Sequence, residues 1–318
     1  MEETVAAGYS AHFMKVLICA GLCFALSPQA VTPSTANMKL IQAAIASFDG
    51  TVGLAARNLT TGEEVVVNGD TAFPTASAIK TAVMMEAWHQ SVAGTLSMDE
   101  RVTLRDNDKV GGSGVLNGLA GGLQLEIRDL IHLMIVLSDN TATNLLVERL
   151  GTRKIDERME AYGLLRTKIF RPTFRDGKPD VFPELEREFG LGMSTPKEMA
   201  TLMALIAEGR AVNPQASAAM VATLRKQQDR AMIARALPDG VEVANKTGTD
   251  SEKLADARGR RGAIRVDAAI VTAGTLRYVI AIFVRHGGDT QYTVDNEAVL
   301  LGAKLSRLIY DRWAAAAR

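Results

Sequence analysis

Three short combinations of reactive side chains stand far apart along the chain. The first is Ser77 followed by Lys80, ahead of a helix-prone stretch. A serine hydroxyl is a weak nucleophile at neutral pH, so an enzyme that uses it must place a proton acceptor within hydrogen-bond distance. Residues three apart share a face of a helix, and burial beside another cation lowers the pKa of a lysine until its amine accepts a proton. Ser77 and Lys80 therefore predict a nucleophile with its own base, although a helix N-cap followed by an exposed lysine is the simpler alternative.

The other two combinations are Ser138-Asp139-Asn140 and Lys246-Thr247-Gly248. The first follows an apolar stretch and precedes another, so we expect a loop between helices that presents polar side chains to a cleft. The second ends a strand-like run, where an extended acyl-amide substrate can lie along the backbone. Taken singly, each is also explained by a helix cap or an exposed strand end. Together the three supply the nucleophile, proton donor and anion site that acyl transfer requires.

The elements that must position these residues are predicted from hydrophobic periodicity. We expect a helix over 38–48, a hairpin of strands 52–56 and 64–67, and strands over 241–247, 263–272 and 276–284, with a last helix over 296–316. Residues 75–238 read as mainly helical, with apolar stripes at 79–88, 127–137, 141–150, 197–208 and 216–224 and no alternating strand.

This order predicts an α+β fold whose antiparallel sheet is built from both ends of the chain and flanked by the terminal helices. Residues 37–74 and 239–318 would form an α/β lobe, and 75–238 an all-helical lobe. Ligand sites usually lie between lobes, so we expect the active site in that cleft.

Composition narrows the classes of function. The 318 residues include 36 basic and 36 acidic side chains, so no net field attracts nucleic acid or an anionic membrane. The four histidines, His12, His89, His132 and His286, show no metal-ligand or triad pattern, and we expect no metal and no cofactor. The partner we expect is a small-molecule substrate.

The N-terminus has the pattern of a signal peptide. Lys15 precedes an apolar run over 16–26 that is too short to span a membrane, and small residues follow it. We expect residues 1–36 to be removed on export to the periplasm, with a possible true start at Met14, and a buried N-terminal helix is the alternative. Both cysteines, Cys19 and Cys23, fall in this segment, so the mature protein would carry no thiol and no stable membrane anchor.

The order and spacing of the three combinations match the signature of class A β-lactamases and penicillin-binding proteins. From about residue 38 to 313 the chain resembles a class A serine β-lactamase, or a close relative in the penicillin-recognising serine hydrolase superfamily. The likeness includes residues 73–77, 135–146, 194–196 and 236–238. It implies a β-lactamase-like fold and a monomer that hydrolyses the amide of a β-lactam.

The resemblance also implies a chemical role for each of four residues. Ser77 would attack the lactam carbonyl and form an acyl-enzyme, with Lys80 in its proton relay. Backbone N–H groups of Ser77 and Thr249 would form the oxyanion hole. Ser138 would pass a proton to the departing lactam nitrogen.

The binding roles follow from the same resemblance. Asn140 would bind the side-chain amide of the substrate, and Lys246 and Thr247 would hold its carboxylate. Gly248 would let the ligand lie close to the strand, and Asp139 would hold the loop. Because arginine binds carboxylates bidentately, Arg235, Arg258, Arg260 and Arg261 are candidates for a second contact to the carboxylate. The run over 250–262 also has the pattern of an exposed hairpin loop, which is the favoured alternative for the three arginines within it.

One segment departs from the family. Class A enzymes use a glutamate to activate the water that removes the acyl group, in a Glu-Pro-x-x-Asn pattern. Here the corresponding stretch is Phe182-Pro183-Glu184-Leu185-Glu186, with Phe182 at the place of the glutamate and Glu186 at that of the asparagine. Our hypothesis is that Glu186 or Glu184 orients this water, and full turnover in both Glu→Gln variants would exclude it. A solvated, charged loop is the alternative.

The missing glutamate keeps two other functions open. One is a D,D-peptidase or esterase on the same scaffold, which would act on D-Ala-D-Ala peptides or short esters. The other is a binding protein that is acylated once by a β-lactam and holds it.

Overall fold

The central sheet is assembled from strands at both ends of the chain. The computed structural model describes residues 33–257 and 259–315. Five strands lie in the order β2-β1-β10-β9-β8, and all neighbours are antiparallel. They are β1 (Thr51–Asn58), β2 (Glu64–Val67), β8 (Glu242–Ser251), β9 (Ala263–Ala273) and β10 (Leu276–Gly287). The predicted α+β fold and its antiparallel sheet are confirmed, and β8, which carries Lys246, is an edge strand.

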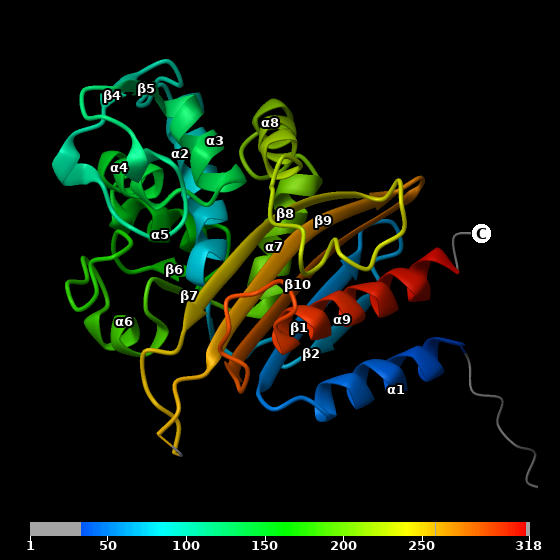
Figure 1. The fold of residues 1–318 in the computed structure, drawn as a ribbon. Helices are drawn as coiled ribbons and strands as arrows, with labels where there is room; N and C mark the ends of the chain where they lie inside the picture. The colour runs from blue at the N-terminus through cyan, green and yellow to red at the C-terminus, as the bar shows by residue number, and fades with distance from the viewer. Residues whose placement is uncertain (1–32, 258, 316–318) are drawn as a thin grey trace, which may run out of the picture. The chain divides into compact units, whose positions relative to one another are not determined.

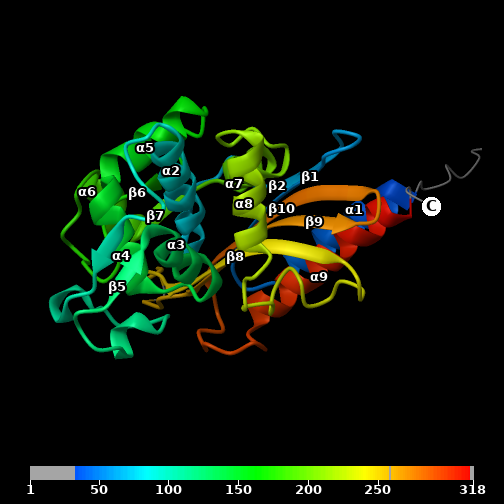
Figure 2. The same cartoon turned by 90° about the horizontal axis from the view of Figure 1, so that it is seen from above.

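Both faces of this sheet are covered, because side chains alternate between them along each strand. Ala269 and Val271 of β9 join the apolar cluster that contains the terminal helices, α1 (Pro33–Ala46) and α9 (Glu297–Ala314). Ala268 and Ile270 join the larger cluster on the other face, where α7 (Pro196–Ala207) packs on β1, β9 and β10. Figures 1 and 2 show α1 and α9 side by side on one face and α7 on the other. The flanking terminal helices are therefore as predicted.

Four of the remaining helices pack on α2 (Lys80–Val92), the helix that follows Ser77. They are α3 (Ile127–Val136), α4 (Asn140–Leu150), α5 (Thr152–Ala161) and α8 (Pro214–Leu224). A further helix is α6 (Pro183–Phe189). The five predicted apolar stripes correspond to α2, α3, α4, α7 and α8. Helices α5 and α6 were not predicted, because α5 is largely polar and α6 has only 7 residues.

The expectation of no strand between residues 75 and 238 is wrong. Strands β3 (Phe73–Pro74), β7 (Gly192–Ser194) and β6 (Lys168–Ile169) form one small sheet, and β4 (Arg101–Thr103) pairs with β5 (Gln124–Glu126). Strands of two or three residues are too short to show alternation, so tertiary pairing alone reveals them.

Residues from Pro33 onward cluster into one compact unit. The division into lobes at 75 and 238 stays a prediction, and α7, from the helical portion, packs directly on the sheet. Most of the predicted signal peptide, residues 1–32, lies outside the described residues, while residues 33–36 belong to α1. Within the described part of the chain, every helix is too short or too polar to cross a membrane.

Candidate active site

Ser77 lies in a single 3₁₀ turn, η1 (Ala76–Ile79), that leads directly into α2. The α-helix thus begins at Lys80, and Ser77 lies in the turn before it. Strand β8 packs against this turn at Gly248, where an added Cβ would lie 2.4 Å from the Thr75 carbonyl oxygen and 3.1 Å from the Ser77 nitrogen. Gly248 therefore lets the edge strand approach the backbone of Ser77, in addition to any room that it leaves for a ligand.

The hydroxyl of Ser138 lies between two buried amines. Lys80 Nζ donates to Ser138 O at 2.7 Å, to Ser138 Oγ at 3.2 Å and to Asn140 Oδ1 at 2.8 Å. Lys246 Nζ donates to the same Ser138 Oγ at 3.1 Å and to Thr247 O at 2.7 Å. Ser138 has a left-handed backbone with φ of 55°, which turns the chain sharply between α3 and α4. The structure thus joins all three sequence motifs at one hydroxyl.

Burial makes the two amines weaker bases than ordinary lysines. Desolvation lowers the pKa of Lys80 well below its usual value, the charge of Lys246 lowers it further, and Asp139 partly opposes this. Desolvation also lowers the pKa of Lys246 to about 8, against the opposing charges of Asp229 and Asp267. Lys80 is therefore suited to accept a proton, while Lys246 stays cationic up to about pH 8.

Asp139 and Asn140 fix the loop beside these amines. Asp139 caps α4 through Ala142 N at 2.9 Å and also accepts from Val115 N and Leu116 N. Its carboxylate is thus occupied by backbone donors, in a structural position. Asn140 Nδ2 donates to Gly111 O at 3.0 Å, and an amide nitrogen has a second hydrogen for a ligand.

Two cavities are lined by Ser77. One of about 360 Å³ also contains Ser138, Thr247 and Thr249. The other, of about 470 Å³, contains Asn140, Thr249 and residues of the loop that precedes α6. The structure thus brings together the predicted residues Ser77, Lys80, Ser138, Asn140, Lys246, Thr247, Gly248 and Thr249.

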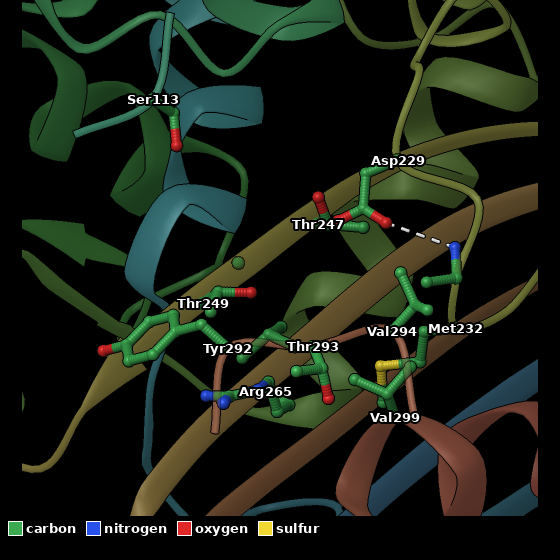
Figure 3. A pocket seen from close by; sticks show the side chains of 13 residues that line it. Ser113, Asp229, Met232, Thr247, Thr249, Arg265, Tyr292, Thr293, Val294 and Val299 are labelled. Carbon is green, nitrogen blue, oxygen red and sulfur yellow. Dashed lines mark hydrogen bonds between the residues drawn. The ribbon is translucent and has the colours of Figure 1, made fainter. Parts of the chain in front are cut away.

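A third cavity, of about 310 Å³, lies along β8 and is lined by Thr247, Gly248, Thr249 and Arg265 (Figure 3). Arg265 is 2% exposed, and its guanidinium donates to the carbonyl oxygens of residues 250, 264 and 291 at 3.2, 2.9 and 2.6 Å. The ring of Tyr292 stacks 4.9 Å from it. Although desolvation lowers its pKa, an arginine stays charged, so this cavity has a cationic wall.

Arg265 was not among the arginines proposed from the sequence. It pairs with Thr249 across β8 and β9, a register that sequence spacing does not reveal. Of the predicted candidates, Arg235 pairs with Asp295, Arg260 pairs with Asp49 and Asp256, and Arg258 lies outside the described residues. Neither Arg235, Arg260 nor Arg261 lines the cavities of Ser77 or Arg265.

In the loop over residues 171–192, Glu186 is bound by an arginine and a backbone N–H. Glu186 Oε1 accepts from Arg171 Nε at 2.8 Å and from Gly177 N at 3.2 Å. Neither Glu184 nor Glu186 lines a cavity that contains Ser77, whereas Asp176 lines the larger one. The role of Glu186 in water activation stays a prediction, and its observed partner is a guanidinium that is itself 2% exposed.

Below the site, Asp267 connects β9 to β8. It lies opposite Thr247 in the sheet and accepts from Asn245 Nδ2 and Ile233 N, each at 3.0 Å. Complete burial raises the pKa of Asp267 to about 7, with donors and the charge of Lys246 opposing and Asp229 adding to the rise. The folded state therefore favours the protonated acid.

This raised pKa predicts a pH-dependent loss of stability. The folded protein holds the proton of Asp267 more tightly than the unfolded chain does. The contribution of Asp267 to the free energy of unfolding is therefore fully present below about pH 4 and is lost as pH rises through about 7, by up to about 4 kcal/mol. Asp267→Asn cannot ionise, so its stability should fall less than that of the unaltered protein. Urea unfolding on both sides of this range measures the difference, and parallel curves for the two proteins would contradict the prediction.

Comparison with known proteins assigns the fold. The family model described as "Beta-lactamase enzyme family" matches residues 37–313. The chain belongs to the β-lactamase enzyme family. The resemblance stated from the motifs is thereby confirmed, and the protein is a hydrolase of the penicillin-recognising fold.

Solved structures of the β-lactamase fold agree. A β-lactamase from Sphaerobacter thermophilus is 29% identical, with a TM-score of 0.73 over 87% of this chain and 96% of that one. PBP-A is 26% identical, with a TM-score of 0.75 over 88% and 97%. A β-lactamase from Chitinophaga pinensis shares the fold at 20% identity, with a TM-score of 0.76 over 89% and 100%.

Proposed function

We propose that the protein hydrolyses the amide bond of a β-lactam through an acyl-enzyme on Ser77. The observation that carries this proposal is the position of the Ser138 hydroxyl, 3.2 Å from Lys80 Nζ and 3.1 Å from Lys246 Nζ, in a cavity that Ser77 also lines. Nucleophile, base, proton donor and cation thus converge, as acyl transfer to a serine requires. Membership of the β-lactamase family supports the same chemistry.

The proposed acylation moves one proton around this cluster. The neutral Lys80 amine accepts the proton of Ser77 Oγ as that oxygen bonds to the lactam carbonyl carbon. The carbonyl oxygen takes up the π electrons, and backbone N–H groups of Ser77 and Thr249 stabilise its charge. The oxygen then re-forms the carbonyl as the C–N bond breaks, Ser138 donates its proton to the departing nitrogen, and Lys80 returns a proton to Ser138 across 3.2 Å. The result is an ester on Ser77.

The substrate carboxylate has a defined cationic subsite in this proposal. Lys246 and Thr247 meet it midway along β8, which continues to Ser251 rather than ending at this motif as the sequence predicted. Arg265 adds a buried positive charge in the cavity that Thr247 also lines. A guanidinium and an ammonium attract a carboxylate more strongly in a partly desolvated site than in water. Asn140 holds the amide of the acyl side chain with its remaining N–H hydrogen.

We expect hydrolysis of the ester to be slower than its formation. Removal of the acyl group needs a base for the attacking water. Glu186 is held by Arg171, and Asp176, the acidic residue of this loop that lines the cavity, pairs with Arg171 and lies 3.5 Å from Lys253 Nζ. Because both carboxylates are bound to cations, we expect neither to take up the proton of the attacking water efficiently, so the acyl-enzyme should accumulate.

The same observation favours a second candidate, a D,D-peptidase or esterase that a β-lactam acylates with little turnover. PBP-A shares 26% of its residues with this chain, and a single-substitution variant of PBP-A is described as an acyl-enzyme complex with penicillin-G. A slow deacylation step is compatible with such a protein.

Intact-protein mass spectrometry with benzylpenicillin, sampled from seconds to hours while product is followed by absorbance, separates these candidates. We expect an adduct of the mass of the penicillin, followed by its release as hydrolysed product over repeated turnovers, and neither in Ser77→Ala. A permanent adduct without turnover would support the peptidase or binding alternatives instead. No adduct would contradict acylation by β-lactams, and D-Ala-D-Ala peptides and short esters would then be tested.

The pKa of Lys246 predicts the alkaline limb of activity. Its ammonium is present below about pH 8 and is lost as pH rises through that value, so kcat/KM should fall there because the carboxylate loses its cation. Lys246→Arg keeps the charge and should move this limb to higher pH. The check is kcat/KM as a function of pH for both proteins. An unchanged limb in the variant would assign it to another group.

We further propose that the protein is an exported monomer that binds a small molecule, without nucleic acid or a stable membrane anchor. The apolar run over 16–26 supports export. The balance of 36 basic and 36 acidic residues argues against attraction to nucleic acid or an anionic membrane. N-terminal sequencing of the periplasmic fraction and size-exclusion chromatography are the tests. A cytosolic protein that retains the apolar run would contradict export.

A further inference from the structure

The loop before α6 presents an aromatic ring to the larger cavity. Phe174 is 57% exposed and lines the same cavity as Ser77 and Asn140. Its backbone is left-handed, with φ of 57°. Such a conformation costs a non-glycine residue on the order of 1 kcal/mol, and a ring that is more than half exposed returns little of this through burial. The fold therefore does not need this ring for its core.

The ring is nevertheless held in a defined place. Asn144 accepts from Thr173 N at 2.8 Å and donates to Thr173 O at 3.1 Å, which fixes the preceding peptide unit. On its other side the ring meets Gly112, where an added Cβ would lie 2.8 Å from Phe174 Cζ. The same added Cβ would lie 2.6 Å from Asn140 Nδ2. The ring edge and the Asn140 amide are thus neighbours across Gly112.

The charged side chains of this cavity bind one another, which leaves its polar and aromatic side chains to contact a ligand. Arg171 pairs with Asp176, and Lys253 lies 3.5 Å from Asp176 and 3.6 Å from Asp250. These ions pair with one another. Two exposed aromatic rings line the cavity, Phe174 and Tyr292. Phe174 is the ring that neighbours the Asn140 amide across Gly112, whereas Tyr292 stacks on Arg265.

We propose that Phe174 is a specificity-determining residue that selects β-lactams whose acyl side chain carries an aromatic ring. This inference rests on the proposed acylation of Ser77, in which Asn140 holds the acyl amide. A substituent one or two bonds beyond that amide reaches the neighbouring ring. Phe174 then packs against it in an offset or edge-to-face arrangement, which adds to the burial of apolar area.

The test compares two penicillins that differ only in this ring: benzylpenicillin, with a phenylacetyl amide, and 6-acetamidopenicillanic acid, with an acetyl amide. The second-order acylation rate constant is measured for each by intact-protein mass spectrometry. We expect the unaltered protein to prefer benzylpenicillin, and Phe174→Gly to reduce that preference by roughly three- to ten-fold. Glycine adopts this backbone conformation without strain, so the variant should fold. Phe174→Tyr keeps an aromatic ring at this position and should retain the preference for benzylpenicillin.

Phe182 supplies a matched control in the same loop. It is also an exposed phenylalanine with a left-handed backbone, at 41% and φ of 50°, but it does not line the cavities of Ser77. Phe182→Gly should leave the preference unchanged. An equal preference in Phe174→Gly and the unaltered protein, or an equal loss in Phe182→Gly, would overturn the role of Phe174 while acylation itself stands. No adduct with either penicillin on the unaltered protein would overturn the proposed function and this role with it.

Discussion

Replacement of Lys80 by methionine is expected to slow acylation of Ser77 by about 10³-fold, because a positioned general base contributes about 10² to 10⁴ to such a step. Methionine has a similar length and no polar atom that accepts a proton. It also removes the donor to Ser138 Oγ and Asn140 Oδ1, so these two residues lose their common anchor. The rate of adduct formation with benzylpenicillin measures the effect.

Stability must be measured alongside, because Lys80 is fully buried and its three acceptors would be left without this donor. Thermal unfolding of the variant shows whether the fold persists at the assay temperature. Lys304→Met, at an exposed position of α9, is the matched control and should acylate at the normal rate. Acylation of a folded Lys80→Met protein at the normal rate would assign the base to another residue.

Thr173→Glu is expected to increase the rate of deacylation by about 10²-fold, in the range of a single general base. Thr173 lines the cavity of Ser77, is 8% exposed, and has both backbone polar groups held by Asn144. A glutamate there would project a carboxylate from a fixed backbone into the cavity where water must attack the ester. In the unaltered loop, the carboxylate of Glu186 accepts a hydrogen bond from Arg171.

The measurement is decay of the acyl-enzyme after excess penicillin is removed. Thr173→Gln has the same shape but no basic oxygen, and it should decay at the rate of the unaltered protein. Equal acceleration in both variants would indicate that added bulk, rather than a base, alters the site. No acceleration in either would show that deacylation is not limited by the absence of a carboxylate at this position.

The sequence predicted best the helices and strands whose apolar residues recur at a regular spacing. The helices over the five apolar stripes and the strands β1, β2, β8, β9 and β10 are present because burial on one or both faces imposes that period. Helix α5, which is mostly polar, and the short strands β3 to β7 carry no such pattern. Their formation depends on neighbours that the chain brings together only when folded.

The chemistry of the site divides in the same way. The sequence by itself determined the reactive groups Ser77, Lys80, Ser138 and Lys246, because a residue type sets what a side chain can donate or accept. Only the tertiary structure decided that Arg265 lines the cavity along β8 and that Glu186 binds Arg171, since strand register and loop path govern both. Burial, likewise a property of the fold, lowers the pKa of Lys80, as its proposed role of a base requires.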